Sequence, residues 1–155
     1  MYLSITQYSN SGGRFASVFN ESTATETNAA FNVLSRAAGS MIDWYTFNRL
    51  RKDFVNGTPS LETATAVRDC MVELIDALYL KQTAYTAGND INGNGTAAVA
   101  SQSNDGISVS FNTMNASQIV EGSKAECKDI ITRHLSGIVN SAGRQVLYRG
   151  LYPGE

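Results

Sequence analysis

Apolar residues recur every three or four positions in three stretches of the chain, 21–50, 60–82 and 116–138. This spacing places them on one face of an α-helix. Because each stretch then has one apolar face to bury, the pattern predicts a mainly α fold, a small helical bundle. The positions expected in its core are Phe31, Leu34, Ala38, Met41, Ile42, Tyr45, Ala64, Val67, Met71, Leu74, Ile75, Leu78, Val120, Cys127, Ile131, Leu135 and Ile138.

Small and polar residues predict where these helices bend, begin and end. Gly39 and Ser40 interrupt the first stretch, and we expect them to bend or split it. Thr58 is expected to cap the second helix, with Pro59 in its first turn, where the missing N–H of proline costs nothing. A glycine at position 137 or 143 is expected to end the third helix.

Residues 96–111 predict a short β-hairpin. The apolar residues at 107, 109 and 111 alternate with serines, which is typical of a strand with one face buried. An Asp-Gly pair just before them favours a tight turn, because these residues tolerate a positive φ. Residues 96–101 are the expected partner strand.

The two ends of the chain complete the prediction of a single domain, 1–155. Residues 1–20 form a polar lead with scattered aromatic residues, which we interpret as an N-terminal arm, a short ordered arm or turn. Residues 144–155 are apolar enough that they are expected to dock, and we interpret them as an extended C-terminal tail. The tail could dock on its own chain or become ordered on a partner, and the sequence leaves both open.

Composition narrows the class of protein. The chain has 155 residues, of which 43% are hydrophobic and 17% charged, so general disorder is not expected. The net charge of −2 argues against a protein that holds DNA through its phosphates, which needs a basic face. No apolar run approaches the ~18 residues of a membrane-spanning helix, and no secretory signal is expected at the N-terminus.

The candidate chemistry is sparse. His134 is the only histidine, so one chain cannot build a metal site from several histidines. As a catalytic base it would need an orienting acid and a nucleophile, and the sequence offers no such set. Residues 89–95 look like the start of a calcium loop, but Ser101 stands where its last ligand, a glutamate, is required. We therefore expect no enzyme activity, no cofactor and no metal site.

Three further residues are candidates for structural roles. Cys70 and Cys127 are expected to be reduced, buried thiols rather than a disulfide, because the chain is no Cys-dense secreted scaffold. Asp43 either lies on a helix surface or makes a hydrogen bond or ion pair, to Arg49 or to another helix.

Four blocks of sequence carry a resemblance to a known family. They are YLSITQYSNSGG at the N-terminus, AFNVLSRAAGSMIDWYTFNRL at 30–50, SQSNDGISVSF at 101–111, and HLSG at 134–137 followed by VLYRG at 146–150. In this order they resemble the small head–tail connector proteins of tailed bacteriophages and prophages, also called adaptor or head completion proteins. The chain departs from the family pattern at Gln102 and Ile107, where a glutamate and a tyrosine are common.

This resemblance implies a structural virion protein at the neck of the particle, made in the host bacterial cytoplasm. About a dozen copies would form a ring beneath the portal protein, extend the DNA channel and receive the next connector or tail-completion protein. DNA would pass without sequence-specific binding, and no membrane would be involved. The residues expected at the ring interface are Asn104, Asp105, Gly106, Ile107, Val109 and Phe111. Those expected to dock on the portal are Leu147, Tyr148, Arg149, Gly150 and Tyr152.

The alternative is a soluble helical binding or regulatory module without catalytic activity, with nucleic acid as one conceivable partner. Its basis is the compact basic cluster of Arg49, Arg51 and Lys52. These cations also close the first helical stretch, and we expect them at a helix C-terminus, where positive charge is favourable.

Overall fold

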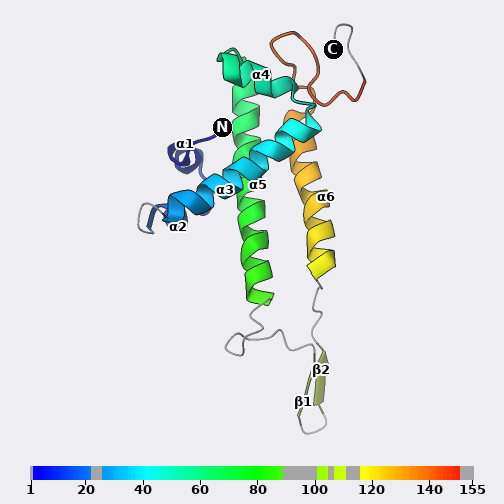
Figure 1. The fold of residues 1–155 in the computed structure, drawn as a ribbon. Coiled ribbons are helices and arrows are strands. Elements are labelled where there is room, and N and C mark those ends of the chain that lie inside the picture. Colours follow the sequence, from blue (N-terminus) through cyan, green and yellow to red (C-terminus); the bar gives the residue numbers. More distant parts are fainter. Residues whose placement is uncertain (1, 22–25, 89–100, 105–106, 111–115, 151–155) are drawn as a thin grey trace.

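The computed structural model describes residues 2–21, 26–88, 101–104, 107–110 and 116–150, and it is mainly helical, as the sequence predicts. In Figure 1, α5 and α6 run alongside each other and α3 lies across them. The residues that follow α6 lie beside α4 at one end of the molecule. In chain order the elements are α1 (Ile5–Asn10), α2 (Ala16–Glu21), α3 (Glu26–Tyr45), α4 (Arg49–Asn56), α5 (Leu61–Gly88), β1 (Ser101–Asn104), β2 (Ile107–Ser110) and α6 (Ala116–Leu135).

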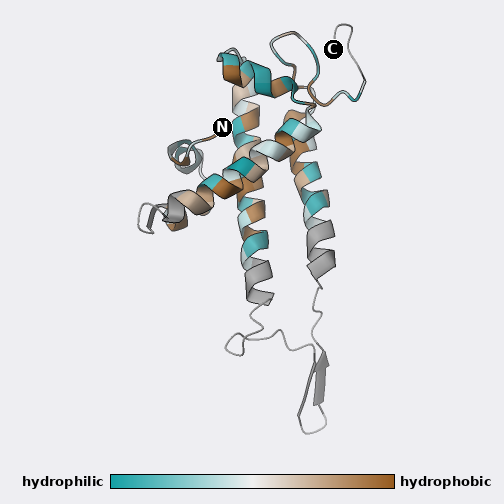
Figure 2. Cartoon of the chain, in the orientation of Figure 1, coloured by the Kyte–Doolittle hydropathy of each residue, from teal (hydrophilic) through white to brown (hydrophobic). Residues whose placement is uncertain are grey.

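The core lies where α3, α5 and α6 meet, and Figure 2 shows hydrophobic residues gathered there. The predicted periodicity is confirmed, because most of the expected positions are buried. Met41, Tyr45, Leu78 and Ile138 are only partly buried and pack around the edge of this core. The predicted positions that are buried are Phe31, Leu34, Ala38, Ile42, Val67, Met71, Leu74, Ile75, Cys127, Ile131 and Leu135.

Residues 2–21 differ from the predicted arm. They form α1 and α2, two helices of six residues each that pack on the bundle. Ser4 caps α1, and its side chain accepts a hydrogen bond from the backbone N–H of Gln7. Leu3, Tyr8 and Phe19 are buried in the common core. The interpretation as an arm was wrong because these aromatic residues are core residues.

The break in the first helical stretch lies after Tyr45 and not at Gly39. Helix α3 runs through Gly39, where the absence of a side chain lets the Tyr2 ring approach closely: a Cβ there would lie 3.3 Å from Tyr2 Cδ2. Arg49 is the first residue of α4. The prediction that Arg49 lies at a helix C-terminus was therefore wrong.

Two other boundaries can be compared with their predictions. Helix α5 begins at Leu61, and Ser60 rather than Thr58 caps it, since Ser60 Oγ accepts a hydrogen bond from the Thr63 N–H at 3.1 Å. Gly137 follows the end of α6 with φ +80°, a left-handed conformation that glycine adopts without strain. The predicted glycine end of this helix is confirmed.

The two strands pair antiparallel, with Ser101 opposite Ser110 and Asn104 opposite Ile107. The partner of β2 is therefore 101–104 and not the predicted 96–101. Figure 1 shows this pair beyond the ends of α5 and α6, at the opposite end of the molecule from α4. None of the helices in the described part of the chain combines the length and apolar character that crossing a membrane would require.

Candidate docking surface

The chain after α6 folds back on itself. The Val146 N–H donates a hydrogen bond to the Ile138 carbonyl at 3.0 Å, and Val139 forms a β-bridge with Gln145. Inside this loop, Asn140 Oδ1 accepts a hydrogen bond from the Arg144 N–H at 2.8 Å. Val146 is completely buried. We call residues 136–150 the C-terminal segment.

Polar contacts attach the C-terminal segment to two helices. Thr63 Oγ1 at the start of α5 donates a hydrogen bond to the Val139 carbonyl at 3.0 Å. The Asp53 carboxylate on α4 accepts two hydrogen bonds, from the Ser141 N–H at 2.7 Å and from the Ser141 hydroxyl at 2.6 Å. Asp53 is only 5% exposed, so these bonds replace water around a buried charge.

Arg49 provides the third attachment. Its guanidinium Nη1 donates hydrogen bonds to the carbonyls of Gln145, at 3.3 Å, and Tyr148, and Nη2 donates to the Gly150 carbonyl at 2.8 Å. Arg49 is buried, so its charge is stabilised by these carbonyl dipoles in place of water. Residues 145–150 are held against α4, so of the two alternatives for the tail the structure shows this part docked on its own chain.

The connection between α3 and α4 has a strained backbone and carries the exposed ring of Phe47. Phe47 has φ +54° and Asn48 has φ +58°, a left-handed conformation that side chains other than glycine adopt at a cost. The Asn48 N–H donates to the Asp43 carbonyl at 2.8 Å, which closes the end of α3. Phe47 is 51% exposed, and Arg49 Cζ lies 5.2 Å from its ring centroid, in cation–π contact. Trp44 nearby is 72% exposed.

The predicted portal-docking residues share this end of the molecule. Leu147 is partly buried against the core, whereas Tyr148 is 49% exposed and Arg149 is exposed. The Tyr148 ring lies over Gly150, where an added Cβ would overlap it. Tyr152 lies outside the described residues. Arg49 therefore contacts both residues, through the Tyr148 backbone carbonyl and the Phe47 ring.

The predicted ring-interface residues lie at the other end of the molecule. Asn104 is the last residue of β1, and Ile107 and Val109 belong to β2, where Val109 pairs with Gln102. Asp105, Gly106 and Phe111 lie outside the described residues. The two predicted sets of interface residues are therefore not brought together.

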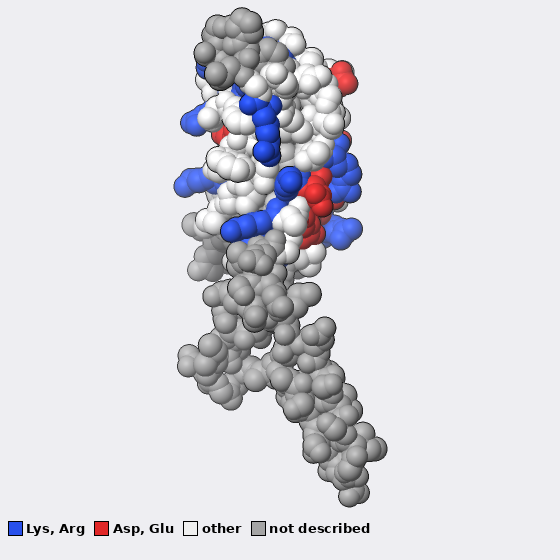
Figure 3. All heavy atoms as spheres, turned by 90° about the vertical axis from the view of Figure 1, so that its right-hand side faces the viewer, with Lys and Arg blue, Asp and Glu red and all other residues white. Residues whose placement is uncertain are grey.

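His134 takes part in an ion-pair cluster between α5 and α6. Its Nε2 lies 2.7 Å from Glu73 Oε2, and Arg133 donates to Glu73 Oε1 at 2.6 Å. Burial raises the pKa of Glu73, but the hydrogen bond with His134 and the charge of Arg133 outweigh it and hold that pKa below its ordinary value. Figure 3 shows, on the α6 side, acidic side chains gathered in a cluster flanked by lysines and arginines. The arrangement links two helices and supplies no nucleophile.

Two tyrosines of the N-terminal region donate hydrogen bonds to carboxylates on the long helices. Tyr2 binds Asp43 Oδ1, and Tyr8 binds Asp76 Oδ1. Burial and then the hydrogen bond to the carboxylate raise the pKa of both tyrosines, so both hydroxyls stay protonated near neutral pH. Asp43 thus makes a hydrogen bond, but its donor is Tyr2, which precedes α1, and not the predicted Arg49 or another helix.

The remaining chemistry is that of buried thiols. Cys70 and Cys127 are free and buried, as predicted. Burial, together with the nearby charge of Glu73, raises the pKa of Cys70 to about 12, which leaves its thiol unreactive near neutral pH. No group of three metal-ligating side chains occurs within the described residues, and the 89–95 loop lies outside them.

Sequence reasoning missed the roles of Arg49 and of the two tyrosines. Arg49 was assigned to a helix end because of its charge, and its carbonyl partners lie about a hundred residues away and carry no sequence signal. The exposed Trp44 and Phe47 could have been noticed as aromatic residues outside the apolar stripe of α3. Comparison of the chain with protein-family models, with curated proteins and with solved structures gave no match.

Proposed function

We propose that this chain is a structural virion protein of a tailed bacteriophage or prophage that forms an oligomeric ring beneath the portal. The ring extends the DNA channel and joins head to tail at the neck of the particle, and the protein has no catalytic role. The four sequence blocks that resemble head–tail connectors support this assignment, and so does the helical fold.

The observation that carries the proposal is the way the C-terminal segment is held. Arg49 binds three backbone carbonyls of this segment, so the backbone is fixed while the Tyr148 ring is left half exposed. Tyrosine and arginine are enriched among the residues that contribute most to protein interfaces. We assign Tyr148 and Arg149, with Leu147 and Gly150 supporting them, to contact with the portal.

A closed ring needs two different contact faces on each subunit, because it forms head to tail around an axis. In this proposal the β1–β2 pair provides a subunit contact at the end of the molecule opposite the C-terminal segment (Figure 1). The net charge of −2 suits a channel wall, since few cations neutralise phosphates and DNA can slide.

The test is capture of an N-terminally tagged chain from cells that produce the particle, followed by mass spectrometry and negative-stain imaging. The wild-type chain should retain a portal-sized protein or form rings. The Tyr148→Ala/Arg149→Ala variant should keep its melting temperature and lose this retention. Recovery of no virion protein by the wild-type chain would contradict the proposal.

DNA binding would favour the alternative, a helical binding or regulatory module. Of its predicted basic cluster, Arg51 and Lys52 are exposed, but Arg49 is buried and bound to the C-terminal segment. Two exposed cations make few phosphate contacts, so we expect weak duplex DNA binding with a shallow dependence on salt. A steep salt dependence would overturn the structural assignment.

A further inference from the structure

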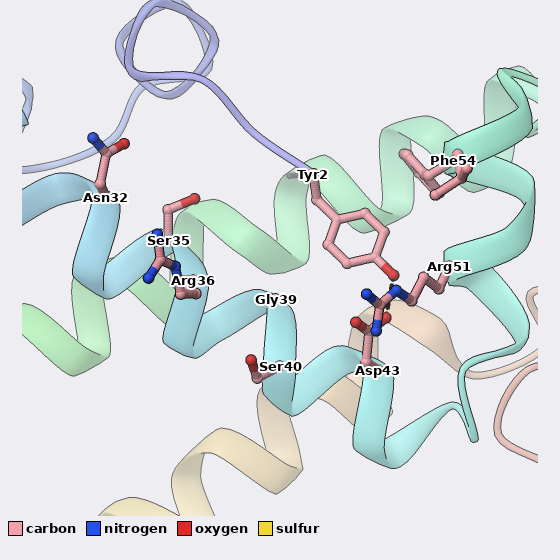
Figure 4. A pocket seen from close by; sticks show the side chains of 10 residues that line it. Tyr2, Asn32, Ser35, Arg36, Gly39, Ser40, Asp43, Arg51 and Phe54 are labelled. Atoms are coloured by element: carbon pink, nitrogen blue, oxygen red, sulfur yellow. Dashed lines mark hydrogen bonds between the residues drawn. The ribbon is translucent and has the colours of Figure 1, made fainter.

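A groove runs along α3 between this helix, α4 and the Tyr2 ring, with a volume of about 640 Å³. Figure 4 shows its lining. One side consists of α3 residues spaced by three or four positions, which share a helix face. The groove extends from Asn32 to Asp43, a distance of roughly 17 Å for a helix that rises 1.5 Å per residue. Its lining residues used below are Tyr2, Arg36, Gly39, Asp43, Arg51, Phe54 and Val55.

The groove has a fixed architecture. Tyr2 packs edge-on against Phe54 with ring centroids 4.8 Å apart, lies over Gly39, and donates its hydroxyl proton to Asp43. A ring held on three sides gives the groove a defined wall before any partner arrives. Preorganised surfaces bind with a smaller entropy loss than surfaces that must become ordered.

The charges in the groove are unbalanced. Arg36 on α3 and Arg51 on α4 are exposed, and neither forms a hydrogen bond or ion pair with any residue that the structure describes. Asp43, the one acidic residue among the lining residues, accepts the Tyr2 hydroxyl, on which the charge of Arg51 also acts, so two arginines face one aspartate. The groove thus offers two guanidinium groups, whose planar N–H donors match carboxylates.

An apolar rim lies next to these charges. Val55 is 77% exposed at the edge of the groove, and Phe54 lines it. A ligand that carries only charge would leave this rim in water. A polypeptide segment with alternating acidic and apolar side chains would cover both.

We propose that this groove binds an acidic segment of a partner protein, whose carboxylates pair with Arg36 and Arg51 and whose apolar side chain covers Val55. Charge complementarity favours this occupant over nucleic acid, because two cations beside a carboxylate neutralise few phosphates. The site is separate from the C-terminal segment and does not depend on the proposed ring. About six residues of extended chain would span it, at 3.3 Å per residue.

The test measures fluorescence anisotropy of a fluorescein-labelled hexapeptide of alternating glutamate and leucine, titrated with the full chain. A peptide with glutamine in place of glutamate and a six-nucleotide oligothymidylate serve as competitor ligands. The test variant is Arg36→Gln/Arg51→Gln. The matched control is Lys124→Gln/Lys128→Gln, which removes two exposed cations from α6 and lowers the net charge equally.

We expect the acidic peptide to bind the wild-type chain and the control variant with dissociation constants within about twofold of each other, and the Arg36→Gln/Arg51→Gln variant at least about tenfold more weakly. The glutamine peptide and the oligothymidylate should not displace the acidic peptide. All the substituted side chains are exposed, so both variants should keep the wild-type melting temperature.

Three results would overturn the inference. The first is no binding of the acidic peptide to the wild-type chain. The second is equal weakening by the Lys124→Gln/Lys128→Gln control, which would reduce the effect to net charge. The third is displacement by oligothymidylate at the same concentration as by unlabelled acidic peptide, which would assign the groove to phosphates instead.

Discussion

The N-terminal segment, residues 2–21, and the C-terminal segment, residues 136–150, are both held against the same helical bundle, the first by side chains and the second largely by its backbone. The N-terminal segment is held by its side chains: the Tyr8 ring is completely buried and its hydroxyl binds Asp76. The C-terminal segment is held largely through its backbone, whose carbonyls accept hydrogen bonds from Arg49 and Thr63.

The two kinds of attachment have different consequences for the side chains of the two segments. When a segment is attached by its side chains, those side chains are buried and contribute to the core. The C-terminal segment buries Val146 and binds Asp53 through Ser141, but its backbone contacts with Arg49 leave Tyr148 49% exposed. The first segment therefore stabilises the fold, whereas the second leaves Tyr148 half exposed and available for the partner contact that we propose.

The largest expected effect comes from replacing a glycine that lies against a tyrosine ring. Each segment contains one such glycine. A Cβ on Gly13 would overlap the Tyr8 ring, and one on Gly150 would overlap the Tyr148 ring. Gly13→Ala should lower the free energy of unfolding by about 3 kcal/mol, because a buried ring has no room to move. Gly150→Ala should change it by less than about 0.5 kcal/mol, because an exposed ring can turn away. Urea unfolding monitored by circular dichroism measures both.

Gly13→Ala needs no positive φ, so a loss of stability would report the clash and not backbone strain. Equal losses for the two variants would contradict the comparison. They would mean that Tyr148 belongs to the core in the same way as Tyr8.

The second effect concerns Arg49. Arg49→Met keeps the length of the side chain but removes the donors to the carbonyls of Gln145, Tyr148 and Gly150. We expect the free energy of unfolding to fall by about 2 kcal/mol, since the hydrogen bonds of a buried charged donor to three carbonyls would be lost. The readout is amide hydrogen exchange, in which the Val146 N–H should exchange faster while the amides of α5 keep their protection. Equally faster exchange of the α5 amides would instead show that Arg49 stabilises the whole core and not only the C-terminal segment.

The long helices could be predicted from the sequence because each repeats its apolar face over several turns. Helices α1 and α2 could not, since six residues are too few to show a period. The position of Tyr148 on the surface followed only from contacts between Arg49 and backbone carbonyls, and such acceptors are the same for every residue type. The Phe47 turn was missed because a glycine usually stands at such a helix end.

The third effect is a loss of stability at high pH that should depend on Tyr8. Burial and the hydrogen bond to Asp76 raise the pKa of Tyr8 above its ordinary value of 10.0. Its contribution is therefore complete below pH 10 and is lost as the pH rises above it, because the unfolded chain ionises first. Urea unfolding from pH 8 to 11 should show a shallower decline for Tyr8→Phe than for the wild-type chain. Parallel declines would contradict the buried hydrogen bond.

The smallest effect is expected at low pH. The pKa of Glu73 is held below its ordinary value of 4.5, so its contribution is present above pH 4.5 and is lost as the pH falls through the folded-state value. Because the Glu73 side chain is 42% exposed, solvent screens the pair, and Glu73→Gln should cost only about 0.3 kcal/mol at neutral pH. Thermal melts from pH 3 to 7 should show a flatter acid side for the variant. If the variant and the wild-type chain lost stability equally at low pH, Glu73 would not be the source of the acid dependence.

The central claim is that the C-terminal segment presents Tyr148 to a partner in the particle. The most direct test introduces a photo-crosslinking amino acid in place of Tyr148 and, as a control, in place of Val18 on α2, which is 44% exposed. Irradiation of particle-producing cells should link position 148, but not position 18, to a portal-sized protein. Crosslinks to that protein from both positions, or from neither, would contradict the claim.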